Sequence, residues 1–177
     1  RTIRLGPSLT PKQITIMAHP ALEGTLPGIG SKAPELRYVK QDRSEGSLTD
    51  HAGEVVILLT YPSVDTSTCA LETRTFNKLA ADLGAHVLIV SMDLPFAFKR
   101  FCAAEGIDKL MTGSDFRYRD AGGKWGARIA EGSMNGTLGR ITWVIDRDGV
   151  VRYCEVAKEL SAEPDYDAAI SAAKELL

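Results

Sequence analysis

The sequence predicts an α/β fold, a three-layer sandwich with a central mixed β-sheet and an N-terminal β-hairpin. Two continuous apolar runs, residues 55–59 and 86–92, have the length and composition of strands that are buried on both faces. The segment between them reads as a helix, so the three elements form a unit with parallel strands and a right-handed crossover. A second pair of apolar runs, near the end of the chain, is joined by a tight turn. These patterns predict a single domain that spans residues 1–177.

The first fifty residues are predicted to hold a hairpin, a loop and a short strand. Residues 2–16 form two runs separated by Gly6-Pro7, which is typical of a small hairpin ahead of the main domain. Residues 18–33 contain three glycines and two prolines, which indicates a loop. We expect after it a short strand near residues 36–39, a turn at 42–45 and a short helical turn capped by Ser47.

Two helices are predicted to follow the two central strands. The first covers residues 70–83, directly after Cys69. The second covers residues 96–105 and is opened by Pro95, because proline is tolerated in a first helical turn, where its missing N–H group is no loss. Residues 113–139 are the least regular part, since a short helix within 117–125 is weakened by about 1 kcal/mol for each of its two glycines. A long, glycine-bearing loop is expected after that helix.

The last part of the chain is predicted to form a hairpin and a helix. Residues 141–145 and 150–156 are apolar runs around the turn Asp146-Arg147-Asp148-Gly149. A final helix starts near Glu163, and its alanines and leucines recur every three or four residues. Strand, helix, strand, helix, hairpin, helix is the order of a thioredoxin-like sandwich, although many α/β domains share that order.

Composition excludes several classes of function. The chain is 44% hydrophobic and 25% charged, which suits a domain with a proper core. A net charge of −2 with scattered basic residues argues against nucleic-acid binding. The apolar runs are far shorter than the ~20 residues that span a bilayer, so no membrane role is expected. The chain starts at Arg1 without a signal-peptide pattern; we expect a cytoplasmic protein, with the periplasm as the alternative.

Cysteine and histidine usage points to thiol chemistry without a metal or cofactor. Three cysteines are too few for a disulfide scaffold, and no Cys-x-x-Cys motif occurs. The three histidines are far apart in the sequence, which predicts no zinc site. No phosphate-binding glycine loop occurs, so no nucleotide or flavin is expected. Cys154 has no cation or helix end beside it in the sequence and is expected to be structural.

Cys69 is the candidate nucleophile because it lies between a buried strand and a helix. The unpaired N–H groups in the first turn of a helix favour a thiolate. Lowering a thiol pKa from about 8.5 to about 6 takes ~3.4 kcal/mol. A helix N-terminus contributes about 0.3–1 kcal/mol and ~2 kcal/mol at best. A cation or further hydrogen-bond donors must therefore contribute the rest.

Thr66 and Pro62 are the candidate residues for shaping the site around Cys69. Thr66 lies three residues before Cys69, so in a helical first turn its hydroxyl would be within reach of the sulfur. The alternative is that Thr66 caps the helix, and both roles can hold together. Pro62 either shields the thiolate from water or only ends the strand.

These residues carry a resemblance to a known family. Pro62-x-x-x-Thr66-x-x-Cys69 after a buried strand resembles the peroxidatic-cysteine motif of the peroxiredoxins. The wider blocks at residues 62–69, 91–97 and 100–102 resemble the bacterial thiol peroxidases, the atypical two-cysteine type. The similarity runs from the N-terminal hairpin to Pro164-Asp165-Tyr166 and so covers almost the whole chain.

The resemblance implies a role for each candidate residue. Cys69 would be the peroxidatic cysteine, Cys102 the resolving cysteine, and Pro62 and Thr66 parts of the pocket. Arg140 occupies the place of the family's active-site arginine, and an arginine there could supply the missing stabilisation of the thiolate. A surface ion pair is the alternative role for Arg140.

The resemblance also implies the reaction and its partners. The chain would reduce hydrogen peroxide and organic hydroperoxides to water and alcohols through a Cys69 sulfenic acid and an intrachain Cys69–Cys102 disulfide. A thioredoxin-type protein would reduce that disulfide, and the enzyme would be a homodimer. The loop at residues 129–139 is expected to line the site and to select the hydroperoxide.

Two other functions use the same residues. A thiol–disulfide oxidoreductase is disfavoured because Cys-x-x-Cys is absent. A thioredoxin-fold redox-signalling or binding protein would use the same disulfide to change a surface. Rapid peroxide turnover with a thioredoxin system distinguishes an enzyme from such a signalling protein.

Overall fold

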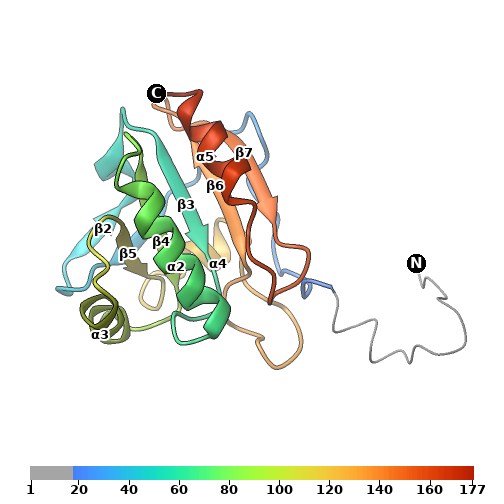
Figure 1. The fold of residues 1–177 in the computed structure, drawn as a ribbon. Helices are drawn as coiled ribbons and strands as arrows, with labels where there is room; N and C mark the ends of the chain where they lie inside the picture. Colours follow the sequence, from blue (N-terminus) through green and yellow to red (C-terminus); the bar gives the residue numbers. More distant parts are fainter. Residues whose placement is uncertain (1–17) are drawn as a thin grey trace, which may run out of the picture.

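A computed structural model describes residues 18–177 (Figure 1), and the hairpin expected over residues 2–16 lies outside this range. Seven strands form one mixed sheet in the order β2-β1-β5-β4-β3-β6-β7. The strands are β1 Arg37–Val39, β2 Glu45–Ser47, β3 Val56–Thr60, β4 His86–Ser91, β5 Met111–Ser114, β6 Ile141–Ile145 and β7 Val151–Val156. The helices are the 3₁₀ helix η1 Leu48–His51 and the α-helices α2 Ser67–Ala80, α3 Pro95–Glu105, α4 Asp120–Gly123 and α5 Tyr166–Lys174.

The centre of the sheet confirms the predicted unit of two parallel strands and a helix. β3 pairs with β4 in parallel from Val56 opposite His86 to Thr60 opposite Val90. On its other side β3 pairs antiparallel with β6, which forms the predicted hairpin with β7. β3 therefore lies between β4 and β6 in the sheet, and all five of its residues are buried.

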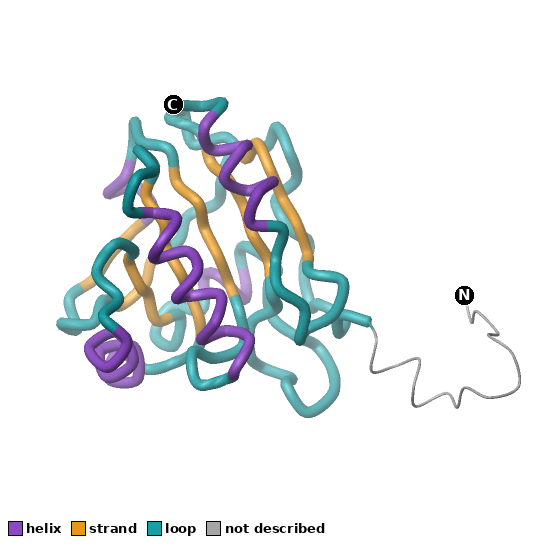
Figure 2. The backbone as a smooth tube through the Cα atoms, in the orientation of Figure 1, coloured by secondary structure: helices purple, strands orange, loops and turns teal. Residues whose placement is uncertain are grey.

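Helices cover the sheet on both faces, which confirms the three-layer arrangement. Ile57 and Leu59 point to one face and pack in a core with residues of α2, α3 and α5. Val56 and Leu58 point to the other face, where the core includes residues of α4 and the buried pair Trp125 and Trp143. Figure 2 shows α2 and α5 crossing in front of the strands, and in Figure 1 α4 lies behind them.

Two strands were missed by the sequence prediction. The expected turn at 42–45 is shorter, and β2 follows it and pairs antiparallel with β1. β5 lies in the region predicted to be irregular and pairs in parallel with β4. Both strands are short, and each carries a glycine that packs against the Tyr38 ring. The packing is tight, since a Cβ atom added to Gly113 would lie 2.7 Å from Tyr38. Apolar periodicity cannot detect strands whose packing residue is glycine.

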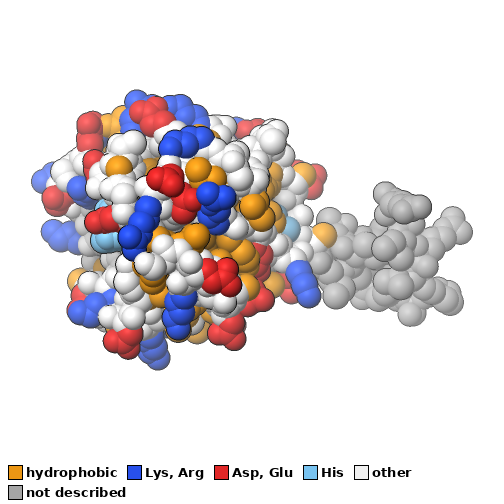
Figure 3. Space-filling model, turned by 90° about the horizontal axis from the view of Figure 1, so that it is seen from above, with side chains coloured by type: hydrophobic (Ala, Val, Ile, Leu, Met, Phe, Trp, Pro, Cys, Tyr) orange, Lys and Arg blue, Asp and Glu red, His pale blue; other side chains and the backbone are white. Residues whose placement is uncertain are grey.

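Helix α2 starts at Ser67, three residues earlier than predicted, so Cys69 lies inside the first turn. The predicted cap of η1 is confirmed, because the Ser47 side chain accepts a hydrogen bond and Asp50 completes a capping box. Within the described residues, no helix is long and apolar enough to cross a bilayer. Acidic and basic side chains are interspersed over the face seen in Figure 3.

Candidate active site

The Cys69 thiol is buried in the first turn of α2 and has no exposed surface. Thr66 is the N-cap of the helix, and its hydroxyl accepts a hydrogen bond of 3.3 Å from the Cys69 N–H group. On the next turn, the Thr73 hydroxyl donates to the Cys69 carbonyl at 2.8 Å and is 2.9 Å from the Tyr61 hydroxyl. The end of β3, where Pro62 is buried, is therefore tied to the helix turn that carries the thiol.

Arg140 reaches the thiol from the residue just before β6. The Thr60 hydroxyl donates to the carbonyl of Gly139 at 2.8 Å, which fixes the start of β6 beside the end of β3. From there, Arg140 Nη2 donates to Cys69 Sγ at 3.3 Å and Nε donates to the Leu160 carbonyl at 2.8 Å. Only 2% of Arg140 is exposed, so the alternative of a surface ion pair is wrong. The guanidinium lies where it stabilises negative charge on the sulfur.

Glu72 completes a buried ion pair with Arg140, whose Nη1 donates to Glu72 Oε2. Glu72 has no exposed surface, and its Oε1 has no hydrogen-bond partner among the described residues. Burial raises the pKa of Glu72 from 4.5 to about 7, although Arg140 opposes the shift. Burial works against the charge of Arg140, but Glu72 and Cys69 outweigh it and raise the pKa of Arg140. The Arg140 guanidinium thus donates hydrogen bonds to two acidic groups, the Glu72 carboxyl and the Cys69 thiol.

Glu72 was not among the predicted site residues, although the sequence carries a signal for it. Cys69, Glu72, Thr73 and Phe76 form the buried face of α2, with the spacing of one helical stripe. A carboxylate on a stripe that otherwise faces the core is rare unless it is paired. It lies three residues after the candidate nucleophile, which places both on one face of the helix.

His19 supports Arg140 from behind. The backbone N–H group of Arg140 donates to His19 Nε2 at 3.1 Å, and the other ring nitrogen donates to the Pro20 carbonyl at 2.8 Å in the matching tautomer. Burial lowers the pKa of His19, so the ring stays neutral and can accept this hydrogen bond. His19 lies in a predicted loop far from Arg140 in the sequence, and no pattern predicts this contact.

Asp93 ties the loop before Cys69 to the start of α3. Its carboxylate accepts hydrogen bonds from the Ser63 hydroxyl at 2.7 Å and from the Val64 N–H group at 2.8 Å. It also accepts one from the Ser91 hydroxyl at 2.5 Å. An exposed ion pair between Arg100 and Asp65 joins the same two segments. The hydrogen bonds of Asp93 and the ion pair of Arg100 with Asp65 thus link the two cysteine-bearing helices.

The other two cysteines differ in their setting, and all three thiols are free. Cys102 lies in α3, is 6% exposed and belongs to the same apolar core as Cys69. Burial raises the pKa of Cys102, with Gln41 partly opposing the shift. Burial and Glu155 raise the pKa of Cys154 in β7 to about 11. Cys154 is therefore protonated at neutral pH and a poor nucleophile.

Two histidines that are far apart in the sequence lie close together in the fold. His51 and His86 lie with ring centroids 4.9 Å apart, and Glu54 lies between them. This cluster lies at the start of β3 and β4, whereas Cys69 follows the opposite end of β3. Among the described residues it is the group with the donors for a metal ion, and it is not part of the thiol site.

We expect Glu72 to make the stability of the protein depend on pH near neutrality. The folded pKa, about 7, lies above the ordinary value of 4.5, so the folded state binds the extra proton between these values. The free energy of unfolding should therefore fall as pH rises from about 5 to 7, by at most ~1.4 kcal/mol per pH unit. Chemical unfolding of wild type and Glu72→Gln across this range measures it, and the variant should lack this component.

The exposed carboxylate Glu175 gives the matched control, and Glu175→Gln should keep the pH dependence of wild type. Burial also raises the pKa of Asp115, to about 6, but this group is present in every variant and cancels in the difference. Equal pH profiles for wild type and Glu72→Gln would contradict the assignment.

Comparisons with known proteins show the family of the chain. The Redoxin family model matches residues 29–170. A thiol peroxidase of Leptospira interrogans is 46% identical over 169 residues, which is 93% of this chain and 99% of that protein. One of Mycobacterium tuberculosis is 46% identical over 149 residues, 84% of this chain and 90% of that protein.

A solved structure is similar over most of the chain. The crystal structure of a peroxiredoxin-like protein from Aquifex aeolicus has a TM-score of 0.85 and 40% identity, and the match covers 89% of this chain and 92% of that one. The chain carries the thioredoxin-like peroxiredoxin fold and a buried thiol beside an arginine. It therefore belongs to the Redoxin family and is a thiol peroxidase of the peroxiredoxin type.

Proposed function

We propose that Cys69 is the peroxidatic cysteine and that Arg140 and Thr66 organise its reaction. The single observation that carries this is the 3.3 Å contact between Arg140 Nη2 and Cys69 Sγ in a buried site. The Cys69 sulfur attacks the outer oxygen of a hydroperoxide, an S–O bond forms and the O–O bond breaks. The leaving oxygen takes up the proton that the Cys69 thiol has released and departs as water or alcohol, and Cys69 is left as a sulfenic acid.

The site would act mainly by electrostatics and positioning. Arg140 is held by Glu72, Leu160 and His19 before substrate arrives, so little reorganisation is needed as charge builds on the leaving oxygen. Thr66 fixes the first turn of α2 through the Cys69 N–H group. Because the nucleophilicity of a thiolate falls with its pKa, this positioning supplies more than ionisation alone.

A groove of about 480 Å³ beside Arg140 is the proposed approach for the hydroperoxide. Its walls include Leu160, whose carbonyl contacts Arg140, and Ser161, whose carbonyl accepts from the Thr68 hydroxyl at 3.3 Å. Residues 131–134 of the predicted selectivity loop also line it. We propose that this loop chooses between small and bulky hydroperoxides.

Cys102 is the proposed resolving cysteine. Its sulfur attacks the sulfenic sulfur, a disulfide forms and the hydroxyl leaves as water. A dithiol protein of the thioredoxin type then reduces the disulfide to two thiols and is itself oxidised to a disulfide. Cys69 and Cys102 lie on two intact helices with free thiols. Their Cα atoms must come within about 7 Å for a disulfide, so we propose that at least one helix end unwinds.

Steady-state turnover tests this function against a signalling role. With a thioredoxin system as reductant, the enzyme should consume hydroperoxide continuously and at catalytic protein concentration. Consumption that ends after one equivalent, with reductant in excess, would favour a redox-signalling protein.

We also propose a cytoplasmic location, since thiols are kept reduced there.

A homodimer is proposed from an exposed apolar surface at the start of α3. Leu94, Phe96 and Phe116 are 44%, 61% and 53% exposed, and the first two immediately flank Pro95. They border a groove of about 540 Å³. Large exposed apolar side chains in one place mark an interaction surface, and sedimentation equilibrium measures whether two chains associate.

The hydrogen bonds of Asp93 are expected to control the unwinding of the helix end that disulfide formation requires. In Asp93→Asn, the loss of charge-assisted hydrogen bonds, worth about 1.5–3 kcal/mol, should lower amide-exchange protection of residues 63–70 by roughly ten- to a hundredfold. Hydrogen exchange of the reduced protein, followed by mass spectrometry, measures the change.

Asp65→Asn is the matched control, because it breaks the exposed pair with Arg100 and such pairs contribute about 0–1 kcal/mol. Its protection should stay within a few-fold of wild type. Similar protection in Asp93→Asn and Asp65→Asn would show that Asp93 does not hold the loop.

A further inference from the structure

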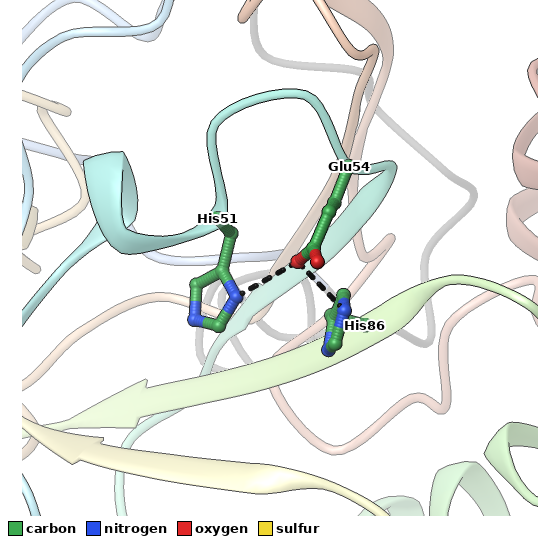
Figure 4. Close-up of side chains that lie close together, drawn as sticks. All are labelled: His51, Glu54 and His86. Carbon is green, nitrogen blue, oxygen red and sulfur yellow. Dashed lines mark hydrogen bonds and ion pairs between the residues drawn. The ribbon is translucent and has the colours of Figure 1, made fainter.

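A second cluster of reactive side chains lies at the other end of the sheet. His51 ends η1, Glu54 lies in the loop before β3, and His86 begins β4. His86 Nε2 is 2.7 Å from Glu54 Oε2, and His51 Nδ1 is 3.3 Å from the same oxygen. Figure 4 shows both rings turned toward this one carboxylate. Three potential ligands from separate parts of the chain therefore converge on one point.

The backbone holds these three residues in place. Gly53 has φ of +85°, which L side chains rarely adopt, and this turn sends the chain back so that the Glu54 N–H group donates to the His51 carbonyl at 3.1 Å. The His86 N–H group donates to the Val55 carbonyl at 2.9 Å. A capped helical turn and the hydrogen bonds of the sheet thus hold the backbone of the three residues in place. Binding of a ligand would therefore need to order little of the backbone.

The donor set suits a divalent transition metal. Two imidazoles and a carboxylate are the protein ligands of many zinc sites with an open fourth position. With bonds of about 2.0–2.1 Å, tetrahedral ligand atoms lie about 3.3 Å apart. The distance of 3.3 Å from His51 Nδ1 to Glu54 Oε2 equals this spacing, whereas that from His86 Nε2, 2.7 Å, is shorter. One ligand atom from each residue lies within 4.8 Å of the others. Small side-chain rotations would admit an ion.

The surroundings give an ion access and room for water. His86 and Glu54 side chains are 43% and 48% exposed, whereas His51 is 14% exposed and anchors the cluster. His51 and Glu54 also line a groove of about 290 Å³. A water molecule can therefore complete the coordination from the open side.

We propose that His51, Glu54 and His86 form a binding site for a divalent transition-metal ion, with Zn²⁺ as the ion to test. The site is distinct from the thiol centre, because it lies beside the start of β3 whereas Cys69 follows the end of β3, and the ends of this five-residue strand lie about 13 Å apart. Bound Zn²⁺ has no redox chemistry, so the ion would clamp η1 and its turn to β4 without consuming peroxide.

Titration of the tag-free protein with ZnCl₂ by calorimetry tests the proposal. One ion per chain is expected, together with a rise in the unfolding midpoint. His51→Ala and His86→Gln should each weaken binding by at least about tenfold, since even the supporting partners of metal ligands cost that much. Peroxidase turnover of both variants should equal that of wild type.

Two controls separate this site from other donors. His19→Gln removes the remaining histidine and should bind Zn²⁺ as wild type does. Replacing Zn²⁺ with Co²⁺ should give visible bands of low-symmetry coordination without the near-ultraviolet band of a thiolate ligand. Absence of binding, binding unaffected by either histidine substitution, or a thiolate band lost on thiol alkylation would each overturn the proposal and leave the cluster as a set of side-chain contacts only.

Discussion

Replacing Arg140 with glutamine is expected to lower the second-order rate constant for hydroperoxide by about 10²–10³-fold. The substitution removes the cation that lies 3.3 Å from the Cys69 sulfur. Because Arg140 is proposed to be one of a few donors that face the developing charge, its loss should appear in the rate of the first step. Stopped-flow kinetics with hydrogen peroxide in excess measures that step directly.

The same substitution leaves Glu72 buried without its partner, which costs about 3–5 kcal/mol when the charge remains. Glu72, with a pKa of about 7, can take up a proton instead, so the loss of stability should be smaller at pH 5.5 than at pH 8. The double variant Arg140→Gln, Glu72→Gln removes both buried charges and should recover most of the stability. Recovery of the rate in this variant would show that Arg140 acts on folding only.

Replacing Cys69 with serine is expected to abolish hydroperoxide consumption, whereas Cys102→Ser should consume about one equivalent and then stop. The serine hydroxyl is not ionised at neutral pH, so no nucleophile remains at position 69. In Cys102→Ser the sulfenic acid forms but finds no thiol. Consumption of peroxide in the presence of the thioredoxin system measures both outcomes.

Cys154→Ser is the matched control for the cysteine variants, because Cys154 packs against the core on the other face of the sheet from Cys69 and Cys102. Its turnover should equal that of wild type. Full turnover by Cys102→Ser, together with its loss in Cys154→Ser, would exchange the roles of these two cysteines.

The main elements of the fold were predictable because they follow apolar patterns. The β3–α2–β4 unit, the late hairpin and α5 are long enough for their periodicity to show, and Pro95 marks the start of α3. β2 and β5 were not predictable, because each is short and packs a glycine against the Tyr38 ring. Their place is set by neighbours in the sheet rather than by their own composition.

The site was predictable where local spacing defines it. Thr66 and Cys69 belong to one helix start, so the cap and the thiol follow from sequence alone, and the resemblance supplied Arg140. Glu72 was detectable from its helical spacing but was missed. His19 and Asp93 act through contacts between distant segments, and no sequence pattern encodes those distances.

Distance in sequence was also a poor guide for the histidines. His51 and His86 are separated by a strand and a helix, yet the parallel pairing of β3 with β4 brings them together. Parallel strands place the residues before each strand at the same edge of a sheet. The distance in sequence between His51 and His86, which argued against a metal site, is thus only the length of one connection between neighbouring parallel strands.

The pairing of Cys69 with Cys102 is tested most directly by mapping the disulfide formed in one turnover. Reduced protein is treated with one equivalent of hydroperoxide, digested without reductant and examined by peptide mass spectrometry. The expected result is a single disulfide between Cys69 and Cys102 within one chain. A disulfide that joins Cys69 to Cys154, or one that joins two chains, would contradict the proposed cycle.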